Sequence, residues 1–292
     1  MITQLESEGF PVAVVCQTLA VSRAGYYAHV RAGTSPREQE DARLRPLVRQ
    51  IFWEHKRRYG ARRIAADARS EPCGPRRASR LLKQLGLQAI QPRSFRPRTT
   101  QSRHPLGYSP NLLLDAKPPS GVNQVWLGDI TFIPLTGARF AYLALLMDLY
   151  SRRIVGWELD EHMTEALVLA ALREAIRRRQ PSPGLIHHSD RGGQYAGGEY
   201  RQVLKRARIE QSMSRPDNCY DNAFMESCFG TLKTELAMEV YANVCAAQQE
   251  IGEYLCYYDS KRRHSSLNYR TPCEFELFQE SVTSPSGQPS FG

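Results

Sequence analysis

The chain has 292 residues, 41% of them hydrophobic, and a formal net charge of +9. This composition indicates a folded protein of two or three domains, and no apolar run approaches the roughly 20 residues that a membrane-spanning helix needs. The first residues also lack the basic start and cleavage site of a signal peptide. Seven cysteines without a C-x-x-C pair favour reduced thiols in the cytoplasm over a disulfide framework or a zinc site.

The positive charge is concentrated in the first 122 residues, which hold 21 Lys and Arg against nine Asp and Glu. The other residues carry a net charge of −3. A basic module of this kind is typical of a protein that binds the phosphate backbone of a nucleic acid. The alternative is a basic surface that has no partner.

Residues 1–36 are expected to form a short helix-turn-helix segment. Apolar residues recur at helical spacing from Val12 to Leu19, and Ser22 is a plausible N-cap for a second helix that begins near Arg23. Two short helices around a short turn indicate a helix-turn-helix, although any helical hairpin has a similar pattern.

Residues 37–90 are expected to form three helices. Apolar residues from Leu44 to Phe52 follow the i, i+3, i+4, i+7 spacing of an amphipathic helix, and two shorter segments follow. Arginines occupy most polar positions, which again favours DNA binding over a plain three-helix bundle with solvated arginines. The candidate DNA contacts in this domain are Arg62, Arg63, Arg76 and Arg77.

Residues 91–122 are predicted to be a linker. They hold six prolines, and basic residues run from Arg93 to Arg103. This composition predicts an extended, basic segment that could follow a phosphate backbone.

Residues 123–280 have the pattern of a mixed α/β domain. Three strand-like runs separated by turn signals predict three antiparallel strands, and helix, strand, helix, strand and helix follow. This order indicates a five-stranded mixed sheet with helices against it. The small polar residues 281–292 are expected to be a disordered tail.

Three acidic residues in this domain are candidates for catalysis. Asp129 lies inside a strand-like run, where acids are usually rare, and Asp190 follows a second strand. Glu226 lies on the helix predicted over 221–235, whose apolar face is expected to hold Phe224, Cys228, Leu232 and Leu236. Each acid alone has an ordinary explanation: a strand edge, a turn or a solvated helix face.

Together the three acids can form a metal site. Two carboxylates on strands of one sheet and one on a helix packed over it can converge on a pair of Mg²⁺ ions, which prefer oxygen ligands. Two such ions activate an attacking oxygen and stabilise a leaving one, which is the chemistry of in-line phosphoryl transfer. Arg191 and Arg215, near these acids in the sequence, could steady a phosphate. His187 and His188 are further possible ligands, but hydrogen bonding at the strand end explains them more simply.

Four segments in this order resemble a known family: "WLGDITFI", "HHSDRGGQYAGGEY", "MSRPDNCYDNAFMESCFGTLKTEL" and "YYDSKRRHSSLNYRTPCEF". They are similar to the OrfB-type catalytic transposase of the bacterial insertion sequence 3 family, a relative of retroviral integrases. Asp190 and Glu226 are separated by 35 residues, the spacing of the D,D-35-E class, and 60 residues separate Asp129 from Asp190. The resemblance extends over about residues 9–280.

The resemblance implies a fold, a reaction and a set of site residues. It implies an RNase H-like catalytic core after an all-α DNA-binding region, with Asp129, Asp190 and Glu226 as ligands of two Mg²⁺ ions, for which Mn²⁺ can substitute. Lys233 is then expected to contact the DNA end. The similar segment with Arg262 and Arg263 either contacts DNA or ends a helix.

The implied activity is DNA strand cleavage and strand transfer at the ends of an insertion sequence. The expected partners are double-stranded DNA of the transposon ends and target, an upstream OrfA-type protein and further copies of this chain. Two other interpretations remain: a DNA-binding regulator with an inactive integrase-like core, and a related nuclease.

Overall fold

The computed structural model describes residues 1–31, 35–91, 107–114, 116–215, 223–237 and 240–283. They belong to two compact units, Met1–Gln88 and Ala89–Gly292, which are considered separately here. Most of the predicted basic linker, residues 92–106, lies outside the described residues, as does the loop 216–222. Within the described ranges, no helix is both long and apolar enough to cross a membrane.

The first unit is all-helical, as expected. Ser22 confirms its predicted role, because its Oγ accepts a hydrogen bond of 3.0 Å from the Gly25 amide in the first turn of a helix. The buried Tyr26 hydroxyl donates to Glu6 over 2.6 Å and so joins the first and third helices. The helices are α1 (Ile2–Ser7), α2 (Val12–Thr18), α3 (Arg23–Arg31), α4 (Pro36–Glu54), α5 (Ala61–Asp67) and α6 (Pro75–Gln84).

Helices α4, α5 and α6 are the three predicted between residues 37 and 90, and they pack around one apolar core. Ser35 caps α4 through its Oγ, which accepts from the Glu38 amide over 3.2 Å. The buried Asp41 of α4 is bound by Arg80 at 2.6 Å and by Arg77 at 2.7 Å on α6. These two guanidinium groups lower the pKa of Asp41 to about 2, so two arginines of this basic unit serve its internal structure.

The second unit is built on a five-stranded sheet in the order β3-β2-β1-β4-β5. The first three strands are antiparallel, as predicted, whereas β4 and β5 run parallel to β1. The strands are β1 (Val125–Leu135), β2 (Arg139–Asp148), β3 (Ile154–Asp160), β4 (Ile186–Ser189) and β5 (Glu210–Met213). The helices are α7 (Glu165–Arg179), α8 (Gly198–Arg206), α9 (Ala223–Glu235), α10 (Val244–Ser260) and α11 (Pro272–Thr283).

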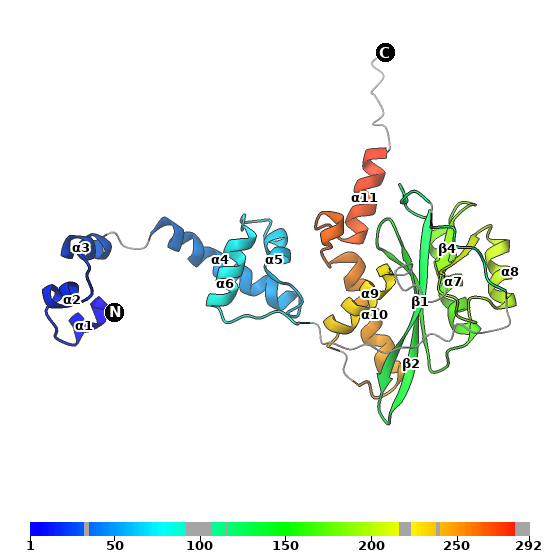
Figure 1. Ribbon diagram of the computed structural model, residues 1–292, viewed down its shortest axis with the longest axis horizontal. Coiled ribbons are helices and arrows are strands. Elements are labelled where there is room, and N and C mark those ends of the chain that lie inside the picture. Colours follow the sequence, from blue (N-terminus) through cyan, green and yellow to red (C-terminus); the bar gives the residue numbers. More distant parts are fainter. Residues whose placement is uncertain (32–34, 92–106, 115, 216–222, 238–239, 284–292) are drawn as a thin grey trace, which may run out of the picture. The chain divides into compact units, whose positions relative to one another are not determined.

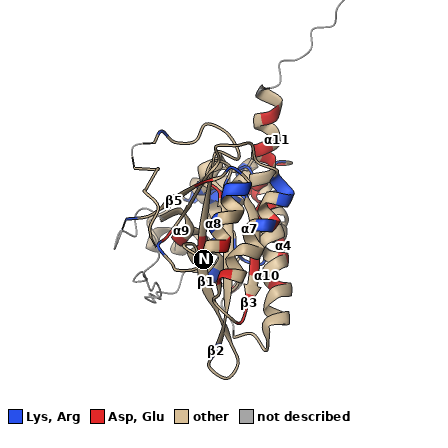
Figure 2. Cartoon of the chain, turned by 90° about the vertical axis from the view of Figure 1, so that its right-hand side faces the viewer, with Lys and Arg blue, Asp and Glu red and all other residues tan. Residues whose placement is uncertain are grey.

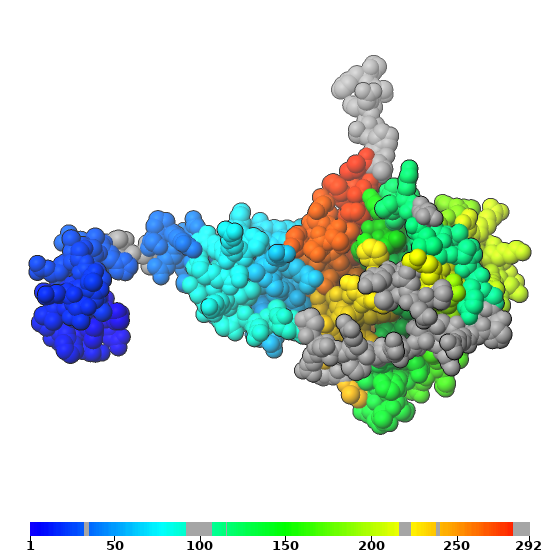
Figure 3. Space-filling model, viewed as in Figure 1, coloured from blue at the N-terminus to red at the C-terminus, as the bar shows by residue number. Residues whose placement is uncertain are grey.

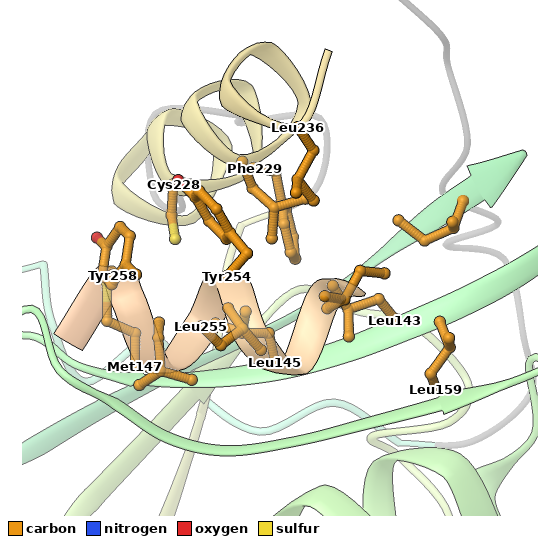
Figure 4. Packing of buried hydrophobic residues seen from close by; sticks show 14 of the residues in the cluster. Leu143, Leu145, Met147, Leu159, Cys228, Phe229, Leu236, Tyr254, Leu255 and Tyr258 are labelled. Carbon is orange, nitrogen blue, oxygen red and sulfur yellow. The ribbon is translucent and has the colours of Figure 1, made fainter. Parts of the chain in front are cut away.

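Helices cover both faces of this sheet (Figure 1). Alternate residues of β1, such as Leu127 and Ile133, pack with β2, α9 and α10 in one core, whereas Trp126 and Ala144 pack with α7 and α8 in the other. Figure 4 shows the first core, in which Phe229 of α9 and Leu236, the residue after this helix, face Tyr254 of α10 and the strand residues below. Because both faces are buried, the sheet is a rigid support for whatever its edges carry.

The C-terminal part contains helices that the sequence patterns did not predict. α10 supplies Ile251, Tyr254 and Leu255 to the core, and α11 follows it. α11 extends to Thr283, so the expected tail 281–292 is helical over its first three residues, and the remainder lies outside the described residues. α11 lies on the surface of this unit (Figure 3), where Leu277 is 67% exposed.

Gly156 of β3 is required by the close approach of α7. A Cβ atom at this position would contact the Ala171 carbonyl oxygen and would lie 2.9 Å from Ala175 Cβ. We therefore expect Gly156→Ala to lower the free energy of unfolding by about 1–3 kcal/mol, because a buried methyl group must push α7 away. Urea unfolding followed by circular dichroism measures this. Gly230→Ala is the control: nothing lies within 4 Å of its Cβ position in α9, so it should stabilise by about 0.5–1 kcal/mol. Unchanged stability of Gly156→Ala would contradict the packing argument.

Candidate active site

Asp129 and Asp190 are neighbours across the sheet because of the register of two parallel strands. β1 and β4 pair from Val125 opposite Ile186 to Gly128 opposite Ser189. Asp129 is the next residue of β1, and Asp190 is the first residue after β4. Paired positions of parallel strands direct their side chains to the same face, and neighbouring strands lie about 4.8 Å apart. The two carboxylates therefore lie side by side where the β4 pairing ends, on the face covered by α9.

Backbone hydrogen bonds hold the two aspartates at the end of the β1–β4 pairing. Asp129 Oδ1 accepts from the Ile130 amide over 2.8 Å, and Asp190 Oδ1 accepts from the Gly192 amide over 2.9 Å in the turn after β4. Gly128 leaves room on the opposite face, where a Cβ would lie 2.8 Å from His187 Nε2. The surrounding backbone thus holds one oxygen of each carboxylate in place.

The charges of the three predicted acids act on one another. Burial raises the pKa of Asp129 well above its ordinary value, and the charges of Asp190 and Glu226 raise it further. The Ile130 amide and the Lys233 ammonium lower it. The structure therefore brings Asp129, Asp190, Glu226 and Lys233 into one electrostatic neighbourhood, although these residues span more than 100 positions of the chain.

Glu226 lies in the first turn of α9, exposed at the surface, and the buried Met225 precedes it. The predicted apolar face of α9 needs one correction. Cys228, Leu232 and Leu236 are buried as expected, but Phe224 is 50% exposed beneath the Arg152 guanidinium, 3.9 Å from its ring centroid. Met225 and Phe229 fill the core instead, because the helix is rotated so that residues 225, 229, 232 and 236 face the sheet.

Lys233 follows Glu226 by two helical turns and is half-buried. Its Nζ lies 4.3 Å from the centroid of the Phe132 ring on β1, a cation–π contact. Burial lowers the pKa of Lys233, and the negative charge of Asp129 opposes that shift. The lysine therefore extends from α9 toward the strand that carries Asp129.

The two histidines beside Asp190 have hydrogen-bonding roles, which favours the simpler interpretation of them. His188 Nδ1 lies 2.8 Å from Ser212 Oγ and its Nε2 lies 3.1 Å from Ser214 Oγ, so both ring nitrogens join β4 to β5 and the residue after it. His187 is on the other face, with Nε2 3.0 Å from the Tyr200 hydroxyl. Burial and the neighbouring His188 lower the pKa of His187 to about 3.

The donor set fits a hard divalent cation. In the part of the chain that the structure describes, no three His, Cys, Asp or Glu side chains form a ready-made metal cage. Mg²⁺ does not need one, because it binds through one or two carboxylates and keeps water and phosphate oxygens as its other ligands. The charges of Asp129 and Asp190 act on each other, so a cation between them would relieve their repulsion, and the exposed Glu226 is a third carboxylate in electrostatic reach.

The predicted DNA-contacting arginines of the second unit lie in different environments. Arg191 Nε donates to the Ser214 carbonyl over 2.7 Å, and its guanidinium lies 4.6 Å from the Tyr108 ring centroid. Arg215 is exposed at the end of the described segment before α9. Arg191 is thus held beside Asp190, where its charge remains near the acids.

The four candidate arginines of the first unit also differ in their environments. Arg62 and Arg76 are exposed on α5 and α6. Arg63 Nη1 donates to the Arg58 carbonyl over 3.4 Å. Arg77 forms ion pairs with Glu40 and Asp41 at 2.6 and 2.7 Å.

Arg262 and Arg263 are buried, which favours the structural alternative that the sequence left open. Arg262 forms a two-pronged ion pair with Glu235, and Arg263 Nη1 lies 2.6 Å from Glu274. Sequence reasoning missed Glu235 as a partner. An acid among the core-facing residues of α9, next to Leu236, was the signal available.

Comparisons with known proteins agree with this architecture. Two family models described as "Integrase core domain" match residues 119–219 and 207–272, and one described as "HTH-like domain" matches residues 38–95. The chain is 41% identical to the insertion element IS600 uncharacterized 31 kDa protein of Shigella sonnei, over 89% of this chain and 97% of that protein. It is 36% identical to transposase InsF for insertion sequence IS3A of Escherichia coli K12, over 91% of this chain and 94% of that protein.

Among solved structures, the catalytic core domain of HTLV-2 integrase in complex with magnesium is similar with a TM-score of 0.42. Its sequence identity is 14%, and the match covers 54% of this chain and 98% of that domain. The sheet, the flanking helices and the family models define this chain as an integrase-core protein with a helix-turn-helix-like region. It belongs to the insertion sequence 3 family of bacterial transposases.

The lowered pKa of His187 predicts that the free energy of unfolding decreases in acid. In the folded protein its pKa is lowered to about 3, whereas an unfolded histidine takes a proton near pH 6.5. The unfolded state therefore binds more protons below pH 6.5, and stability falls as the pH drops from there toward 3. We expect His187→Gln to reduce the slope of stability against pH between 6.5 and 4.5, by up to about 1.4 kcal/mol per pH unit. Urea unfolding at several pH values measures both slopes, and equal slopes would contradict the assignment.

Proposed function

We propose that Asp129, Asp190 and Glu226 are the metal-binding carboxylates of a DNA strand-transferring active site. The observation that carries this proposal is the adjacency of Asp129 and Asp190 at the end of the β1–β4 pairing. The influence of the Glu226 charge on Asp129 supports the third position. The three carboxylates would hold two Mg²⁺ ions, with Mn²⁺ as a substitute, and such ions activate an attacking oxygen and stabilise a leaving one in phosphoryl transfer.

The residues of the chain have separate tasks in this proposal. Because the pKa of Asp129 is raised, protons compete with a cation for this carboxylate, so cation affinity should increase with pH. The fixed backbone contacts of Asp129 and Asp190 hold their oxygens in place before substrate arrives, which lowers the cost of reorganisation. Lys233 places a positive charge beside these acids, where it would steady the phosphate of the DNA end.

The attacking groups belong to water and DNA. Hydrolysis of one strand at the transposon end would free a 3′-hydroxyl, which would then attack a phosphodiester of the target or of the other end. No serine or tyrosine of the chain is required as a nucleophile. The helical first unit, with exposed Arg62 and Arg76, would bind the terminal DNA.

Assembly with other molecules completes the proposed function. Two transposon ends must be held together during strand transfer, so the active form would contain more than one copy of this chain. An upstream OrfA-type protein of the same element would contribute to recognition of the ends.

Substitution of the acids tests the active site. Asp129→Asn, Asp190→Asn and Glu226→Gln should each reduce Mg²⁺-dependent cleavage and strand transfer by at least about 100-fold, since each removes a ligand charge worth several kcal/mol in the transition state. A duplex with the terminal sequence of the chain's own element is the substrate. Binding of this duplex, measured by fluorescence anisotropy, should remain, which separates catalysis from DNA recognition. Strand transfer by Glu226→Gln at the wild-type rate would disprove the proposed site.

Two neighbouring arginines of α6 test DNA recognition as a matched pair. Arg76 is exposed, so Arg76→Ala should weaken DNA binding and lower the slope of log affinity against log salt concentration by about 1, without changing the melting temperature. Arg77 is paired with Glu40 and Asp41, so Arg77→Ala should lower the melting temperature. Anisotropy titrations at several salt concentrations and thermal melts provide both readouts. Wild-type affinity and salt dependence for Arg76→Ala would exclude this residue from the DNA interface.

A further inference from the structure

A buried ion pair joins the end of α9 to the segment after α10. Glu235 is the last residue of α9 and is 7% exposed, and Arg262 is 4% exposed. Arg262 Nε lies 3.0 and 2.9 Å from the two carboxylate oxygens of Glu235, and Nη2 lies 2.8 Å from Oε1. Both prongs of the guanidinium therefore engage one carboxylate, the most directional form of ion pair.

Residues of α10 and of the segment after it surround this pair. The Tyr254 hydroxyl donates to Glu235 Oε2 over 3.1 Å, and the Arg262 guanidinium lies 5.5 Å from the Tyr258 ring centroid. His264 packs edge-on against Tyr258, with ring centroids 4.6 Å apart. The pair thus connects α9, α10 and the segment 262–264, which sequence reasoning had left between a DNA contact and a structural role.

The geometry of α9 relates this pair to the active-site residues. Successive residues of a helix are rotated by about 100°, so Glu235 lies about half a turn away from Glu226, and Lys233 lies on nearly the same side as Glu226. Holding Glu235 against α10 therefore determines the direction in which Glu226 and Lys233 point. About 13 Å of helix separates Glu226 from Glu235 along the axis.

The other contacts of this face of α9 are mainly apolar. Met225, Cys228, Phe229, Leu232 and Leu236 pack into the core, and the hydrophobic effect that drives this burial is non-directional. A buried ion pair adds little net stability, because the cost of removing both charges from water offsets their attraction. Its two-pronged geometry, in contrast, permits one orientation of the carboxylate.

We propose that the Glu235–Arg262 pair is a positioning device that sets the rotation of α9 and so directs Glu226 and Lys233 toward Asp129 and Asp190. The proposal rests on the proposed function, because it takes Glu226 as a metal ligand. Glu235 and Arg262 are positioning residues in it, since they act on the site through α9. The segment after α10 is thereby assigned a role inside the protein.

Glu235→Gln and Glu276→Gln form a matched pair of variants for the test. Both glutamate side chains are 6% exposed, and both bind arginine. Glu276 lies on α11, whose acidic residues are red in Figure 2, and it binds Arg153, Arg179 and the Ser151 hydroxyl, which all lie outside α9. The same chemical change is therefore made at equal burial, once on α9 and once elsewhere.

The first readout is hydrogen exchange of α9 peptides in the full-length, metal-free chain. Glu235→Gln should speed exchange over α9 by at least ten-fold relative to the wild type, and Glu276→Gln should leave α9 at the wild-type rate. The second readout is Mn²⁺ affinity, measured by electron paramagnetic resonance without DNA, which Glu235→Gln should weaken at least five-fold and Glu276→Gln should not change.

A double variant separates the loss of positioning from a loss of folding. Glu235→Leu with Arg262→Met replaces the pair by apolar side chains, which buried ion pairs often tolerate without loss of stability. We expect this variant to keep the wild-type melting temperature and affinity for the end duplex, but to lose at least ten-fold in strand transfer and to require more Mg²⁺ for half-maximal activity. Wild-type strand transfer by this folded double variant would overturn the proposal.

Further outcomes separate this proposal from the proposed function. If Glu226→Gln binds Mn²⁺ as the wild type does, the assignment of Glu226 as a ligand fails. If Glu226→Gln weakens Mn²⁺ binding but Glu235→Gln changes neither α9 exchange nor Mn²⁺ affinity, only the positioning role fails. Loss of end-duplex affinity in the double variant, with Glu235→Gln unchanged in all readouts, would make Arg262 a DNA contact instead and would also overturn the proposal.

Discussion

The parallel pairing of β4 with β1 is the constraint on which the candidate site depends. The pairing extends over four residues of each strand and ends at Gly128 and Ser189, and the residue after each of these two is an aspartate. This pairing brings Asp129 and Asp190 together although 60 residues separate them in the chain. Their mutual repulsion, together with burial, raises the pKa of Asp129. A sheet with cores on both faces holds this unfavourable arrangement in place.

The arginines of the protein fall into two groups, those that form internal ion pairs and those that are exposed. Arg77, Arg262 and Arg263 form ion pairs that hold helices or neighbouring segments together. Arg62, Arg76 and Arg215 are exposed. Arginine suits both purposes, because its planar fork binds a carboxylate inside a protein as readily as a phosphate at its surface. The net charge of the first unit therefore overstates the number of arginines that can meet DNA.

Much of the architecture could be predicted from local patterns. The alternation of residues and the turn signals predicted three antiparallel strands, and Ser22 was correctly expected to cap a helix. The rotation of α9 was predicted less well, since Phe224 is exposed and Met225 is buried. Both are apolar and adjacent, so periodicity over one helix could not decide which of them faces the sheet. That choice depends on contacts between α9 and distant residues, both in the core formed by β1, β2 and α10 and at the Glu235–Arg262 pair.

By itself, the sequence determined the order of helices and strands as far as α9, the family, and the spacing of the three candidate acids. These features can be recognised in the sequence because they depend on the pattern of neighbouring residues and on short motifs. Only the tertiary structure decided that β4 lies beside β1, that the acids share one electrostatic neighbourhood, and that Arg262 pairs with Glu235, 27 residues earlier. Such partners depend on packing across the whole domain, because burial and ion pairing act between residues that are close in space, regardless of their separation in the chain.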